Sequence, residues 1–125
     1  MINFVPRNTK ERGLLKAYRS ALYVIPKEPF KEWADFYNEE SQNDLESRLN
    51  EKHIYLIDFF YGDDLRDILE PYYIKIFENE LMYWNCYKHE WPKDLNLDVF
   101  LDWFEVILCD DIFDLKSGKI MTEKV

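Results

Sequence analysis

The sequence predicts a single α+β (α/β-like) domain, with two layers in which helices pack against a small sheet of three to four strands. Three observations support this. The chain has 125 residues, which is close to the commonest size of one domain. Hydrophobic residues make up 47% of it, enough to build one core. Short runs rich in strand formers alternate with segments of helical periodicity, in the order α-β-α-α-β-α-α-β.

The first elements are a helix and a strand. Asn8 and Glu11 have the spacing of a helix-capping pair, and apolar and basic residues then separate onto two faces. We therefore expect a short amphipathic basic helix over 9–19. The apolar run 21–25 is rich in strand formers and stops at Pro26, which predicts a buried strand.

The next segment predicts two helices and a second strand. Pro29 suits the first turn of a helix, and apolar residues at helical spacing extend this helix over 29–38. A shorter helix is expected over 43–49. The run 53–60 is the clearest strand, and its one interior charge, Asp58, should face solvent or pair with a base.

The longest periodic segment covers residues 64–85 and carries one wide apolar stripe. Pro71 interrupts it, so we expect either a kinked helix or two helices that meet near Glu70. Asn96 can cap a further helix. The apolar run that follows predicts a third strand starting at 106 and able to run on to 115.

The arrangement of the strands follows less directly from the pattern. Ile120 and Met121 could fold back as a minor fourth strand. Helices between strands favour parallel neighbours with right-handed crossovers. The order of the strands within the sheet stays open.

The charge is unevenly distributed. The net charge is −9, but residues 1–27 hold six basic residues against one acidic, and the rest of the chain holds ten basic and 24 acidic residues. We expect a basic helical arm over 1–20 that packs on an acidic globular domain over 21–125. Contact of the arm with phosphates or an anionic lipid surface is the alternative. The acidity of the body disfavours nucleic acid as a partner.

The sequence predicts a cytoplasmic protein. No apolar run reaches the roughly 18 residues that span a bilayer, and the start of the chain lacks the features of a secretory signal. The two cysteines, Cys86 and Cys109, form no disulfide framework or zinc motif. Cys109 lies in an apolar run and is expected to be buried. No cofactor is predicted.

Carboxylates are the most abundant candidate ligands. Two sets stand out, Asp98, Asp102 and Glu105 on one predicted helical face and Asp110, Asp111 and Asp114 on the last strand. They could hold a divalent metal or share acid–base work. A solvated acidic surface is the favoured alternative. Asp110 and Asp111 point to opposite faces of a regular strand, so both cannot line one site.

A loop rich in aromatic residues follows the longest helical segment. It contains Tyr83, Trp84, Tyr87, His89 and Trp91. It could form a recognition surface, because tryptophan and tyrosine supply much of the contact energy of interfaces. The favoured alternative is a loop that closes over the core, with Tyr87 and Trp91 as the better surface candidates. Glycine-rich phosphate loops and serine-nucleophile motifs do not occur.

Four segments together resemble a small bacterial family of uncharacterised proteins. They are YVIPKEPFKEW (23–33), IYLIDFF (54–60), IFENELMYW (76–84) and WPKDLNLDVFLDWFEVILCDDIFDL (91–115). The resemblance implies a complete domain over roughly 21–115 and assigns no catalytic residue, because that family has no assigned activity. Pro71 and the basic N-terminal extension depart from its pattern.

The function that fits these features best is a non-catalytic protein–protein interaction module with a basic protein partner. The candidate partner-binding residues are Tyr87, His89, Trp91, Asp98, Asp102, Asp111 and Asp114. One alternative is an immunity or inhibitor protein, or a DNA mimic, that masks a basic partner. The other is a carboxylate-dependent metal enzyme with Asp98, Asp102 and Asp110 as ligands.

Overall fold

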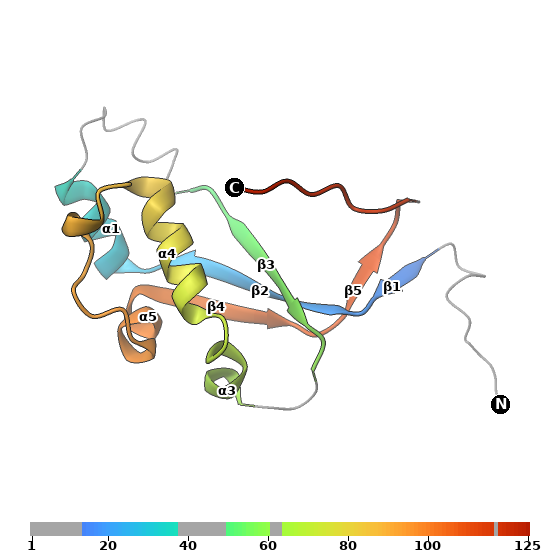
Figure 1. Cartoon of the computed structure of the whole chain (residues 1–125). Helices are drawn as coiled ribbons and strands as arrows, with labels where there is room; N and C mark the ends of the chain where they lie inside the picture. Colours follow the sequence, from blue (N-terminus) through green and yellow to red (C-terminus); the bar gives the residue numbers. More distant parts are fainter. Residues whose placement is uncertain (1–13, 38–49, 61–63, 117) are drawn as a thin grey trace.

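The computed structural model describes residues 14–37, 50–60, 64–116 and 118–125, and these form a mixed α+β domain (Figure 1). The predicted fold class is confirmed. The described strands are β1 (Leu15–Ala17), β2 (Arg19–Pro26), β3 (His53–Asp58), β4 (Phe104–Cys109) and β5 (Ile112–Asp114). The described helices are α1 (Glu28–Phe36), α3 (Leu65–Leu69), α4 (Tyr73–Trp84) and α5 (Leu97–Trp103), with a 3-10 turn η3 (Lys88–Glu90).

The main sheet has the strand order β3-β2-β4, and both pairs are antiparallel. A second, two-stranded sheet joins β1 to β5, also antiparallel. The expectation of parallel neighbours is therefore wrong. Strand β2 has eight residues and is about 26 Å long, whereas α1 has nine residues and is only about 14 Å long. The helix lies at the end of β2 and does not return the chain to its start, so the next strand enters from that same end (Figure 1).

The core lies between the main sheet and the helices. Leu22, Val24, Ile57 and Phe104 are buried on the sheet face that the helices cover. Phe77 of α4 fits between these layers and contacts aromatic rings of α5 and β4. The helices therefore form one layer over one face of the sheet (Figure 1).

Local signals set the helix boundaries. Pro29 lies in the first turn of α1, as expected. The Asn96 side chain accepts a hydrogen bond from the Val99 amide at 2.9 Å and caps α5. Around Pro71 the chain forms a turn, so α3 and α4 are two separate helices. Of the two predicted forms, a kinked helix or two helices that meet near Glu70, the second is confirmed.

The helix predicted over 9–19 is wrong in its described part. Residues Leu15–Ala17 form β1, and Arg19 begins β2. Strand β1 pairs with β5, where Leu15 lies opposite Asp114. This contact between distant parts of the chain overrides the helical periodicity, which reports only local preference.

Two further predictions involve residues beyond the described ranges. Residues 1–13 and the short helix over 43–49 lie outside them. The division into an arm over 1–20 and a body over 21–125 therefore stays a prediction.

The last strand differs from the prediction. The run 106–115 is broken, because β4 ends at Cys109 and β5 begins at Ile112 in the other sheet. At the break, the buried Ser20 hydroxyl donates a hydrogen bond to the Asp110 carbonyl at 3.0 Å. Ile120 and Met121 form no strand and are exposed.

Within the part of the chain that the structure describes, no helix is long and apolar enough to cross a bilayer.

Candidate functional site

The face of the main sheet that the helices leave uncovered is apolar. In the register of the strands, Tyr23 of β2 lies between Ile54 of β3 and Ile107 of β4. Ile54 is 65% exposed and Ile107 is 43% exposed. Residues directly opposite each other in a sheet point to the same face, so these three side chains form a continuous apolar row.

A second row lies beside the first. Ala21 lies between Leu56 of β3 and Cys109 of β4, and both of these neighbours are exposed. The expectation that Cys109 is buried is wrong, because alternation along β4 turns its side chain away from the helices. We call the two rows, Tyr23, Ile54, Ile107, Ala21, Leu56 and Cys109, the open sheet face.

Charged residues stand at both ends of the open sheet face. Asp58 lies opposite Arg19 at one end, and Glu105 lies opposite Ile25 at the other. Arg19 and Asp58 are 4.0 Å apart and both exposed, which confirms that Asp58 faces solvent and meets a base. The apolar rows are therefore bordered by charged groups, as is typical of the rim of an interface.

The aromatic loop is only partly exposed. Tyr87 is 62% exposed, and His89 beside it is also exposed. Trp91 is half-buried, packs against the core and donates from Nε1 to the Asn85 carbonyl at 2.8 Å. Trp91 is thus held by the fold, as expected for a loop that closes over the core, whereas Tyr87 and His89 remain available to a partner.

The predicted helical carboxylate face is not formed as expected. Helix α5 ends at Trp103, so Glu105 lies on β4 and does not continue the face of Asp98 and Asp102. Asp98 accepts a hydrogen bond from Arg66 at 2.6 Å, and this bond raises the pKa of the Arg66 guanidinium. Asp102 is exposed.

The carboxylates of the last strand are also separated. Asp111 lies 3.0 Å from the ammonium group of Lys16. Asp114 belongs to β5 and accepts a hydrogen bond from the Lys116 amide. In the described ranges, no group of three or more histidine, cysteine, aspartate or glutamate side chains could hold a metal ion. Asp98, Asp102 and Asp110 therefore form no ligand set there.

A buried polar network lies on the helix side of the sheet, and none of its residues was among the predicted site residues. Glu80 of α4 is only 5% exposed. Its Oε2 accepts a hydrogen bond from the Tyr55 hydroxyl and lies 2.7 Å from Nδ1 of His53. Asn79 donates to the same tyrosine oxygen at 2.9 Å. The network joins β3 to α4.

This network was marked in the sequence by a carboxylate in an apolar stripe. Glu80 follows Ile76 by four residues and Phe77 by three, which places it on their face of the helix. His53 and Tyr55 share one face of a strand because they are two residues apart. Only the packing of α4 on β3 brings the two patterns together.

The environment of Tyr55 keeps its hydroxyl protonated. Burial, together with the negative charge of Glu80, raises the pKa of Tyr55 well above its ordinary value. The phenol therefore acts as a hydrogen-bond donor to Glu80 throughout the physiological range. This arrangement positions the Glu80 carboxylate at the inner end of a hollow described below.

Comparison with known proteins adds no relative. No family model matches this chain, and no curated protein and no solved structure shows significant similarity to it. The resemblance to a bacterial family therefore stays an expectation, and the roles of the residues above follow from the structure alone.

Proposed function

We propose that this protein is a non-catalytic interaction module that binds a basic protein through the open sheet face. The observation that supports this best is the exposure of Ile54, Leu56, Ile107 and Cys109 in two adjacent apolar rows. Exposed apolar patches with a polar rim are typical of protein–protein contact sites. Water contact with these side chains is unfavourable, so covering them favours association.

Charge supports a basic partner over a second copy of the chain. The net charge of −9 makes two copies repel one another, while it attracts a basic protein and speeds its encounter. Asp58 and Glu105 at the ends of the rows give further contacts for such a partner. An inhibitor or immunity protein that masks a basic cleft is one form of this function.

The experiment is affinity capture of the tagged full chain from its host, followed by identification of partners present at equal stoichiometry. The test variant is Ile54→Lys, which places a charge at the end of the first apolar row, on a side chain that is 65% exposed. The matched control is Met82→Lys, because Met82 is an exposed apolar residue on α4, away from this face. Circular dichroism verifies that both variants fold.

We expect a basic partner whose binding falls about tenfold or more in Ile54→Lys, because the variant puts a charge where an apolar side chain supplied contact energy. Binding should be unchanged in Met82→Lys and weaker at high salt. Retention of the partner by Ile54→Lys would contradict the proposal. So would a purified chain that is a dimer by light scattering and a monomer after Ile54→Lys, because a second copy would then occupy the face.

A further inference from the structure

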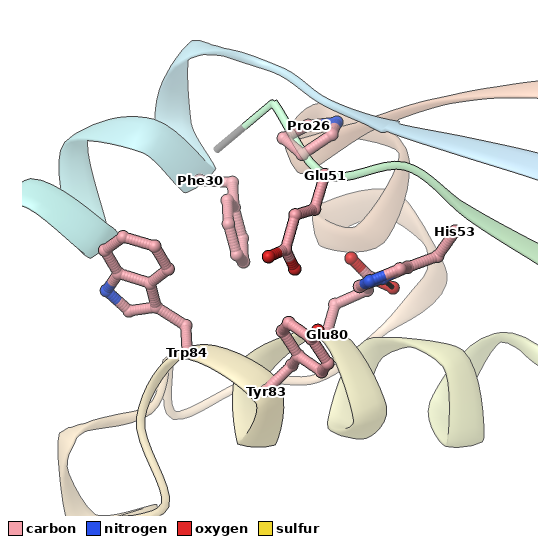
Figure 2. A pocket seen from close by; sticks show the side chains of 7 residues that line it. All are labelled: Pro26, Phe30, Glu51, His53, Glu80, Tyr83 and Trp84. Atoms are coloured by element: carbon pink, nitrogen blue, oxygen red, sulfur yellow. Dashed lines mark hydrogen bonds and ion pairs between the residues drawn. The ribbon is translucent and has the colours of Figure 1, made fainter. Parts of the chain in front are cut away.

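A small hollow lies on the helix side of the sheet, between α1, α4 and the start of β3 (Figure 2). It has an empty volume of about 280 Å³, part of it open to solvent. Its lining consists of Pro26, Phe30, Glu51, His53, Glu80, Tyr83 and Trp84. Because much of this space is open to solvent, the hollow is too small for a drug-sized ligand and suits only the end of a side chain.

Aromatic rings form the apolar walls of the hollow. Phe30 comes from α1, and Tyr83 and Trp84 come from the last turn of α4. Trp84 donates from Nε1 to the Ala34 carbonyl at 3.0 Å, and Tyr83 packs edge-on against His53. These contacts fix the rings in place before any ligand arrives, which lowers the entropy lost on binding.

Two carboxylates supply negative charge. Figure 2 shows the exposed Glu51 reaching into the space between the rings, with Glu80 on the side of the helix. The contacts of Glu80 with His53 and Tyr55 both use Oε2, and its Oε1 has no hydrogen-bond partner among the described residues. If His53 is protonated, the two carboxylates still leave the lining with one net negative charge.

This combination is the chemistry that recognises alkylammonium groups. Aromatic rings attract a cation through the negative potential of their faces, and they also contact its methyl or methylene groups. A carboxylate adds direct charge attraction. We propose that the hollow binds an alkylammonium group, such as the free or methylated end of a lysine side chain, between Glu51, Glu80 and the ring of Trp84.

The proposal is independent of the open sheet face, because the hollow lies on the opposite side of the sheet. Its test is a nuclear magnetic resonance titration of the full chain with choline. The control ligand is 3,3-dimethylbutan-1-ol, which has the same shape as choline and no charge. Nα-acetyl-lysine N-methylamide, unmodified and trimethylated at Nζ, then distinguishes a free from a methylated ammonium.

We expect choline to shift the Trp84 indole and Tyr83 resonances and to bind about fivefold or more tightly than the neutral alcohol. Glu51→Gln should remove most of that preference, because it deletes the charge at an exposed position and leaves the core intact. Glu78→Gln is the matched control, since Glu78 is an exposed glutamate on α4 outside the hollow.

Three results would overturn the proposal. Equal binding of choline and the alcohol would show that charge plays no role. Absence of shifts at Trp84 and Tyr83 would show that the ligand binds elsewhere or not at all. An unchanged preference for choline in Glu51→Gln would remove the carboxylate from the site.

Discussion

The two faces of the main sheet carry similar apolar residues but differ in their exposure to solvent. On the covered face, Ile57 is 4% exposed under the helices. Three residues earlier on the same strand, Ile54 is 65% exposed on the open sheet face. Strand β3 carries apolar residues on both sides, which is the pattern of a strand buried on both faces. The described helices, however, cover only one side. The surplus apolar surface is the basis of the proposed binding function.

The largest expected effect on stability comes from a substitution on the covered face of the sheet. Ile57→Ala should lower the free energy of unfolding by about 2–5 kcal/mol, because it leaves a cavity in the core. Ile54→Ala should cost less than about 1 kcal/mol, which is the scale of strand preference alone. Urea denaturation of both variants measures the difference. Equal losses would mean that Ile54 is covered in solution.

The second effect concerns the polar contact between β3 and α4 on the covered face. Glu80→Ala should lower the free energy of unfolding by about 1–3 kcal/mol, because it leaves Tyr55 and His53 without their acceptor. Glu78→Ala, an exposed change on the same helix, serves as the control in the same denaturation experiment. A loss no larger than that of the control would show that the network does not hold α4 on the sheet.

The third effect depends on pH. Since the folded pKa of Tyr55 is raised, the folded state keeps the proton that the unfolded chain releases near the ordinary value of 10.0. Stability should therefore be constant with respect to this group below pH 10 and fall above it. By pH 11 the loss amounts to about 1.4 kcal/mol.

The variant Tyr55→Phe isolates this contribution. Its stability between pH 9 and 11 should fall less steeply than that of the unchanged protein when both are measured by urea denaturation. Parallel curves for the two proteins would contradict the raised pKa. Absorbance at 295 nm gives a second measurement, because Tyr55 should ionise only after the exposed tyrosines.

The smallest effect is on chemical accessibility and leaves stability unchanged. Both cysteines are exposed and free, and Cys109 lies on the open sheet face. In the variant Cys86→Ser, the remaining thiol is that of Cys109. In native buffer it should react with a disulfide reagent at a rate within about tenfold of its rate in the unfolded chain. Slow reaction of Cys109 would indicate that something covers this face in solution.

Helix boundaries were the features most open to prediction. Pro29, Pro71 and Asn96 act through the nearest turns of the backbone, so their positions predict where α1 begins, where α3 and α4 separate and where α5 is capped. Strand positions at β2 and β3 followed from composition. The site was less predictable, since the aromatic loop and the acidic residues were noticed, whereas Glu80 was not singled out beside the apolar stripe.

The sequence by itself determined a domain with an α+β core, the caps and breaks of its helices, and a strand at His53–Asp58. Only the tertiary structure decided that the strands are antiparallel, that Leu15–Ala17 pairs with β5, and which face of the sheet stays uncovered. The physical reason is the distance along the chain over which each interaction acts. Caps, proline and periodicity act within a few residues, whereas strand pairing and the meeting of Glu80 with Tyr55 depend on contacts between distant segments, which no local pattern encodes.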